Sequence, residues 1–345
     1  MSAGFGVFVS GVVIYCAIYA MQALSLNLKF GTVGLIDLGV VGYFAVGAYA
    51  YTLVTAPPPG PLDSYGIGLG WPMWAGFIIA PIIAGLFALL VGMPALRLEG
   101  EYLAIATYAF AEVLRALITN QTWLTNGVVG FKDLQQPFRN LFGSGAAYQY
   151  FFMVLVLVVL GLLLLGLNRL NRSPYGRSSR SVRENEAVAL SVGKNATAIK
   201  IKSFALGGMI AGLAACFYVT FQTAVFPTNF VPEMTWVVWI GLTIGGVGNY
   251  LGVIIGTFVL VAAQEATRLL PTGSSMIYKI PPMRFIIMGI ILILMIRFRP
   301  KGILPERPWI DRSPLPTTAD LRTQPVMVAS ASEHAAAEPP AGGAL

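Results

Sequence analysis

Long apolar runs separated by short polar segments dominate this sequence. A helix that crosses a bilayer needs about 20 mostly apolar residues. Runs of that kind predict spanning helices at 5–28, 33–54, 72–96, 102–118, 150–167 and 203–222. Two further apolar regions follow, at 235–263 and 282–296. The pattern therefore predicts an all-α, polytopic membrane helix bundle of about 8–10 spans, including short broken or re-entrant helices.

Positive charge gathers in the segment 168–202 and orients these spans. Because loops rich in Lys and Arg stay in the cytoplasm, the segment is predicted to be a cytoplasmic loop, as is the one after the last run. Alternation then puts Lys29 and the turn 97–101 on the cytoplasmic side. The basic residues of the loop are Arg169, Arg172, Arg177, Arg180, Arg183, Lys194, Lys200 and Lys202.

The two cytoplasmic assignments constrain the region 235–263. If it were one span and 282–296 another, the chain after the last run would end on the outer side. The conflict disappears if the region breaks and turns back, leaving two arms that are each short for a full crossing. The residues at the break are Gly245, Gly246, Gly248 and Asn249.

Glycine-rich segments are the candidates for a translocation path. Non-helical backbone at membrane depth needs cover from protein or a water-filled cavity, so Gly245, Gly246 and Gly248 are predicted to line the path, together with Gly34 and Gly39 in the first half. Close helix packing or a tight cytoplasmic turn explains the same glycines equally well. Asp37 is a further path candidate, since carboxylates inside apolar runs are often functional. Its place after Gly34 favours a simpler role as a helix N-cap near the cytoplasmic edge.

Composition narrows the chemistry. Hydrophobic residues make up 56% of the chain and charged residues 11%, which excludes an ordinary soluble domain. The one histidine, His334, and two cysteines in apolar runs, Cys16 and Cys216, predict neither a metal site nor a catalytic triad. The positive-inside pattern accounts for the net charge of +7 without nucleic acid. Residues 1–310 are predicted to form the membrane domain and residues 311–345 a disordered cytoplasmic tail.

The loop 168–202 holds the most specific local pattern. Pro174 and Gly176 predict a turn, and residues 181–190 a short amphipathic helix that ends at Gly193. Three small apolar residues on this mostly polar helix suit docking into a groove of a partner protein. They are Val182, Ala189 and Val192.

Five segments in sequence order carry a family resemblance: GTVGLIDLGVVGYFAVGAY (31–49), LRLEGEYLAIATYAFAEVLR (96–115), SPYGRSSRSVRENEAVALSVGKN (173–195), TIGGVGNYLGVIIG (243–256) and RFRPKGI (297–303). As a set they resemble the permease family of ABC importers for branched-chain amino acids (leucine, isoleucine and valine), in its M-type membrane subunit. The third segment resembles the coupling loop that sits against the ATPase subunit. By this resemblance the coupling residues are Arg183, Glu184, Glu186, Ala187, Ala189 and Gly193.

The resemblance implies a multi-pass subunit of the bacterial inner membrane that is not itself an enzyme. It implies three kinds of partner: a homologous permease, two ATPases that use ATP, and an extracytoplasmic binding protein that delivers substrate. The chain itself would bind no cofactor. Its nearest approach to a Walker A motif, at 192–195, lacks the upstream Gly and the following Ser or Thr.

Two alternatives remain open from the sequence. The cargo could be urea or a short amide carried by the same mechanism. A secondary transporter driven by an ion gradient would instead use Asp37, Glu112 or Glu265 as ion sites. Against that, Glu112 with Arg115 and Glu265 with Arg268 are spaced to form local ion pairs on one helix face.

Overall fold

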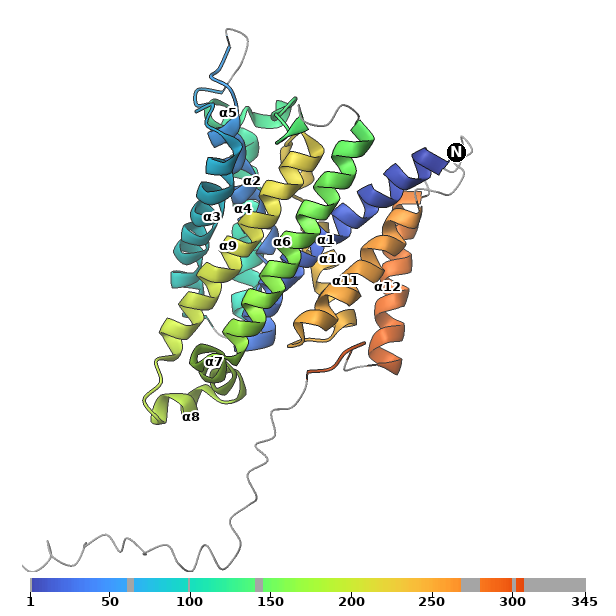
Figure 1. Cartoon of the computed structure of the whole chain (residues 1–345). Coiled ribbons are helices and arrows are strands. Elements are labelled where there is room, and N and C mark those ends of the chain that lie inside the picture. Colours follow the sequence, from blue (N-terminus) through green and yellow to red (C-terminus); the bar gives the residue numbers. More distant parts are fainter. Residues whose placement is uncertain are drawn as a thin grey trace, which may run out of the picture. The chain divides into compact units, whose positions relative to one another are not determined.

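Apolar helices joined by short loops make up the described part of the chain (Figure 1). The structure, a computed structural model, describes residues 2–60, 65–98, 100–139, 145–267, 280–299 and 302–306. Within these ranges there is no β-strand, only an isolated bridge between Phe131 and Val225. The predicted all-α membrane bundle is confirmed.

Among the residues that the structure describes, five helices are long and apolar enough to cross a membrane. They contain or match five of the predicted runs, and most extend beyond them. They are α1 (Ser2–Val33), α3 (Met73–Ala95), α4 (Glu101–Asn120), α6 (Gly145–Arg172) and α9 (Ala196–Gln222). Four shorter apolar helices complete the bundle: α2 (Val40–Thr55), α10 (Pro232–Gly245), α11 (Tyr250–Ala266) and α12 (Ile280–Phe298).

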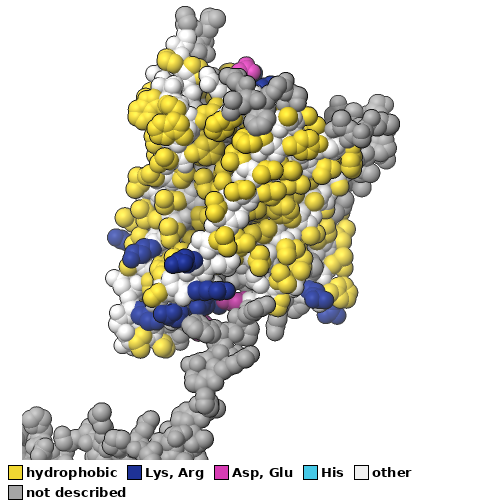
Figure 2. Space-filling model, in the orientation of Figure 1, with side chains coloured by type: hydrophobic (Ala, Val, Ile, Leu, Met, Phe, Trp, Pro, Cys, Tyr) yellow, Lys and Arg dark blue, Asp and Glu magenta, His cyan; other side chains and the backbone are white. Residues whose placement is uncertain are grey.

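Short helices lie at the two ends of the bundle. The turns α5 (Thr122–Thr125), η1 (Gly127–Val129) and η3 (Pro227–Asn229) lie at one end, and α7 (Pro174–Glu184) and α8 (Glu186–Ser191) at the other (Figure 1). Lys and Arg side chains gather around α7 and α8, while apolar side chains cover the middle of the molecule (Figure 2). The positive-inside rule predicts that the end with α7 and α8 is the cytoplasmic one.

Helix α1 runs through the centre of the bundle. It packs against α6, α9, α10 and α11. Between Cys16 and Val33 every residue except Tyr19 and Phe30 is buried. By contrast, α3 and α6 present large exposed apolar side chains such as Leu86, Leu90, Leu162 and Leu165. Helix α1 is therefore an internal helix, whereas α3 and α6 face lipid or another chain.

Small residues bring α3 and α9 together. Ala80, Ala84 and Ala88 recur every fourth residue on α3 and are fully buried. They meet Gly208 and Gly212 of α9, where an added Cβ would lie 2.4 Å from Ala88 Cβ and 2.6 Å from Ala84 Cβ, respectively. Because lipid tails are as apolar as the side chains, close packing of this kind holds membrane helices together.

The predicted break in 235–263 is confirmed. Helices α10 and α11 form an antiparallel hairpin, and the chain turns at Gly246 and Gly248, with φ of 109° and 87°. These angles favour glycine. Asn249 caps α11, because its side-chain oxygen accepts hydrogen bonds from the backbone N–H groups of Leu251 and Gly252.

The predicted run 33–54 is not one helix. Residues 34–39 are non-helical, and α2 begins only at Val40. At 16 residues, α2 is about 24 Å long and falls short of the hydrocarbon thickness. Gly34, with φ of 84°, starts the unwound segment.

The predicted tail 311–345 and the pairing of Glu265 with Arg268 lie outside the described residues. The predicted Glu112–Arg115 pair is present, at 2.8 Å.

Candidate functional site

The basic segment between α6 and α9 folds as two helices, α7 and α8, that meet at Asn185. The predicted single helix over 181–190 is wrong, because Asn185 is extended (φ −158°) and its side chain caps α8 by accepting from Val188 N at 3.1 Å. The predicted turn at Pro174 and Gly176 is also wrong, because both residues lie in the first turn of α7. Ser173 is the N-cap of α7, and Pro174 occupies its first turn, where a missing N–H costs nothing.

The two sides of α7 and α8 differ sharply. Val182 and Ala189 are 4% and 1% exposed and pack against the chain's own helices, which corrects their prediction as docking residues. On the same inner side, Tyr175 donates to Ile199 O at 3.3 Å, and burial raises the pKa of its phenol, so it remains a neutral donor.

Three apolar residues in or just after α8 are exposed. Val188, Leu190 and Val192 are 58%, 53% and 66% exposed. We call these three residues the α8 patch. Only Val192 was among the predicted docking residues. Of the predicted coupling residues, Glu184, Ala187 and Gly193 are also exposed.

Of the three remaining predicted coupling residues, Ala189 is buried, and the other two form ion pairs within the chain. Glu186 lies 2.7 Å from Lys200, which joins α8 to α9. Arg183 lies 2.9 Å from Glu306 and also donates to the carbonyl of Gly31 at the end of α1. Both side chains therefore connect the loop to the bundle.

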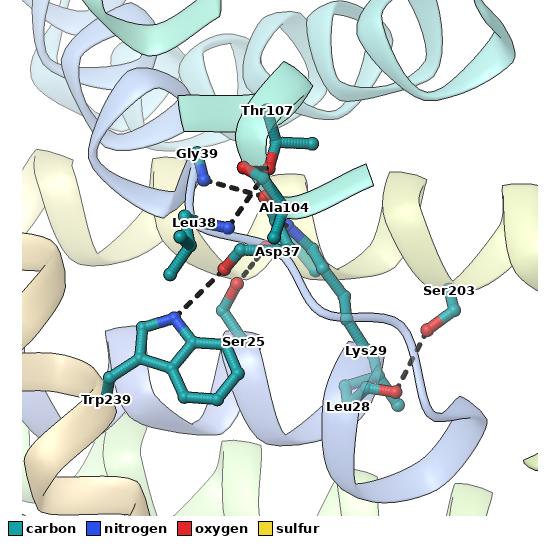
Figure 3. Close-up of polar contacts among 11 residues, drawn as sticks. Ser25, Leu28, Lys29, Asp37, Leu38, Gly39, Ala104, Thr107, Ser203 and Trp239 are labelled. Atoms are coloured by element: carbon teal, nitrogen blue, oxygen red, sulfur yellow. Dashed lines mark hydrogen bonds and ion pairs between the residues drawn. The ribbon is translucent and has the colours of Figure 1, made fainter. Parts of the chain in front are cut away.

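A buried ion pair holds the unwound segment 34–39 (Figure 3). Lys29 Nζ lies 2.6 Å from Asp37 Oδ2, and both side chains are 0% exposed. The ammonium group also lies 4.1 Å from the ring centroid of Tyr43 and 5.1 Å from that of Phe204. Lys29 thus lies inside the last two turns of α1, beyond the predicted run 5–28, and its cytoplasmic side stays a prediction.

Asp37 is not the N-cap of α2, as favoured from the sequence; that position is Gly39. Its second oxygen nevertheless accepts a hydrogen bond from Gly39 N at 2.8 Å. Trp239 donates its indole N–H to the backbone carbonyl of Asp37 at 3.1 Å, and Leu38 N donates to the Thr107 hydroxyl at 3.1 Å (Figure 3). Side chains from α1, α4 and α10 therefore satisfy the polar groups of the unwound backbone.

The α10–α11 break is also covered by protein. The carbonyls of Ile244 and Gly245 accept hydrogen bonds from Ile303 N (2.9 Å) and Leu304 N (3.1 Å). On the other side, Asn27 Oδ1 of α1 accepts from Gly248 N at 2.9 Å. Residues 302–306, which we call the strap, thus lie directly against the break.

The comparison with known proteins gives the family. The model of the branched-chain amino acid transport system permease component matches residues 8–296. This chain belongs to the branched-chain amino acid permease family. The permease is 31% identical to the high-affinity branched-chain amino acid permease protein LivM of Salmonella typhimurium, over 84% of this chain and 68% of that protein. No solved structure matches.

Further relatives include both permease types of one archaeon, Methanocaldococcus jannaschii. The permease is 25% identical to its probable LivM, over 88% of this chain and 94% of that protein. It is 26% identical to its probable LivH, over 74% and 78%. The chain is therefore a multi-pass transport subunit of this family, as the resemblance implied.

Sequence reasoning missed three features of the permease. The Lys29–Asp37 pair joins two charges eight positions apart, and opposite charges inside apolar runs were the available signal. The α8 patch was hidden by treating α7 and α8 as one helix. A cavity of about 450 Å³ at the opposite end is lined by Asp133, Leu134, Gln135, Gln136, Arg139 and Thr223.

Proposed function

We propose that this permease carries branched-chain amino acids across the bacterial inner membrane as a subunit of an ATP-driven importer. The observation that supports this best is the family match over residues 8–296. The LivM relative of Salmonella typhimurium, at 31% identity, is itself a branched-chain amino acid permease protein. Leucine, isoleucine and valine are accordingly the expected cargo.

The proposed assembly contains this chain, a homologous permease, two ATPases and an extracytoplasmic binding protein. Similarity to both LivM and LivH types supports pairing of two related permeases. ATP would be used by the partner subunits, since the sequence has no Walker A motif of the form GxxxxGK followed by Ser or Thr. This subunit then binds no cofactor of its own.

The α8 patch is the proposed contact for the ATPase. Exposed apolar residues at the basic end of the bundle gain by burial in a partner's groove. Glu184, Ala187 and Gly193 lie beside the patch at the surface, and Ala189 anchors α8 to the bundle from the inner side. Through the Glu186–Lys200 pair, a movement of α8 would shift α9 and bias the bundle between inward-open and outward-open states.

The proposed path wall consists of the two non-helical segments, with Gly34, Asp37 and Gly39 in one and Gly245, Gly246 and Gly248 in the other. Backbone that leaves the helical pattern at membrane depth occurs where protein or a water-filled path covers it. In the described state protein covers much of both segments. Opening would therefore require these covering contacts to change.

Uptake of labelled leucine by cells carrying the full transport system tests the proposal. We expect leucine uptake by the wild type, and its loss when Val188→Asp and Leu190→Asp place charge in the α8 patch. Thr197→Asp, which adds the same charge as either substitution alone at an exposed position at the start of α9, is the matched control for each single variant. Absence of wild-type leucine uptake would refute the cargo, and full uptake by the patch variant at normal membrane levels would refute the docking surface.

A further inference from the structure

The strap is bound to the α10–α11 break by backbone and side-chain contacts. Besides the hydrogen bonds from Ile303 and Leu304, Asn249 Nδ2 donates to Pro305 O at 3.3 Å. A Cβ added to Gly302 would lie 2.5 Å from Gly246 Cα, and one added to Gly248 would lie 2.6 Å from Glu306 Oε2. The hydrogen bonds, and the lack of space for even a Cβ atom at these glycines, mean that the strap and the break must move together.

Arg183 connects α7 to this unit. One guanidinium nitrogen lies 2.9 Å from Glu306 Oε2 at the end of the strap, and another donates to Gly31 O of α1. The stem of the side chain crosses Gly34, where an added Cβ would lie 3.0 Å from Arg183 Cγ. Arg183 therefore contacts the end of α1, the start of the unwound segment and the strap at once.

The α10–α11 break also contacts α1 directly. Asn27 of α1 accepts from Gly248 N, and an added Cβ at Gly31 would lie 2.8 Å from that nitrogen. Among the ion pairs of the described residues, Arg183–Glu306 is the one that joins the cytoplasmic helices to the strap. Its side chains are 24% and 31% exposed, and pairs exposed to this extent contribute little to folding stability.

We propose that Arg183 and Glu306 are positioning residues that transmit movement of α7 to the α10–α11 break. The geometry makes them a connection between the coupling helices and one wall of the path, distinct from the α8 patch that faces the partner. This inference rests on the proposed function, because it needs an ATPase that moves α7 and α8. It assigns Arg183 a role inside the chain in place of a contact with the ATPase.

The test is reconstitution of the complete importer in proteoliposomes, with leucine uptake and ATP hydrolysis measured together. Arg183→Gln and Glu306→Gln are each expected to keep the complex assembled and hydrolysing ATP. Leucine transported per ATP should fall by about fivefold or more, the lower end of typical coupling between sites. The matched control is Arg177→Gln on the same helix, whose exposed side chain donates to Arg172 O; it should transport leucine at the wild-type ratio.

A second measurement uses the paired variant Arg183→Cys with Glu306→Cys. Joining the two thiols with a short bifunctional reagent should raise leucine per ATP above that of the unlinked pair, because the link again carries motion from α7 to the strap. The native Cys16 and Cys216 are buried and serve as the unreactive background.

Three results would overturn the inference: a wild-type ratio in both single variants, a parallel loss of hydrolysis and uptake, or no gain on linking. Failure of the proposed function is distinguishable, because the wild-type complex itself would then transport no leucine.

Discussion

Lys29 and Asp37 place an amine and a carboxyl group 2.6 Å apart in a region with no exposure to solvent. Removing two charges from water is costly, and their attraction offsets that cost only when the geometry is good and the remaining donors and acceptors are bonded. Here the second carboxylate oxygen binds Gly39 N, and two aromatic rings flank the ammonium group. The pair therefore fixes where α1 ends and where the unwound segment runs.

Breaking this pair on one side should destabilise the permease. Lys29→Met or Asp37→Asn leaves one buried charge without its partner, and we expect a loss of about 3–5 kcal/mol in the free energy of unfolding. Denaturant titration in detergent measures it. The double variant should recover most of the loss, since both charges are gone while Asn at position 37 still offers an oxygen to Gly39 N. Single variants as stable as the wild type would show that the pair is not required.

Residue-level features of this kind were only partly predictable. The sequence identified Asp37 as an unusual carboxylate and placed Lys29 on the cytoplasmic side by alternation of the spans, but it did not show that the two side chains meet. Only the three-dimensional structure shows that Gly207 leaves room for the lysine: a Cβ there would lie 2.2 Å from Lys29 Cε. Nothing in a single sequence pairs positions 29 and 207.

At the scale of elements, the close approach of α3 and α9 gives a direct test. Gly212→Ala would place a Cβ 2.6 Å from Ala84 Cβ and 3.0 Å from Pro81 Cα, and that backbone cannot move aside easily. We expect a loss of about 1–3 kcal/mol, as for other overpacked cores. Gly161→Ala on α6 is the matched control, because nothing lies within 4 Å of its added Cβ. Equal unfolding free energies for the two variants would contradict the packing argument.

The elements themselves followed from hydropathy and charge with two exceptions. Charge balance between the two basic segments predicted the α10–α11 break before any coordinates, because backbone direction must alternate across a membrane. The prediction of one helix over 33–54 was wrong, since its apolar residues continue through 34–39 while the hydrogen-bond partners of that segment, Thr107 and Trp239, are distant in sequence. The prediction of one helix over 181–190 was wrong because Asn185, which caps α8, was taken as a residue inside that helix.

For the molecule as a whole, orientation in the membrane is the main expectation to check. We predict that Ser191→Cys on α8 reacts with a membrane-impermeant maleimide only in inverted vesicles. Gln135→Cys, exposed beside the cavity at the other end, should react only in intact cells, because the two positions lie at opposite ends of the bundle. Labelling of the unaltered permease measures the background. The reverse pattern would invert the topology and move the α8 patch away from any cytoplasmic ATPase.

The site was less predictable than the bundle. Family resemblance identified the correct loop, yet it could not say which side chains point outward: Val188 and Leu190 do, whereas Val182 and Ala189 do not. Which side chains of α7 and α8 are exposed depends on how these helices pack against α9. Such contacts leave no periodic signal in a short polar loop.

The burial of α1 has a consequence for how the permease is made. Lys29 leaves the ribosome before Gly207, against which it finally packs and which follows 178 positions later. At about 5–20 residues per second, that interval lasts roughly 10–35 s. Asp37 emerges only eight positions after Lys29, so the lysine can be neutralised before α9 exists. Helix α1 can thus insert into the bilayer early, and the helices that are translated later then pack around it.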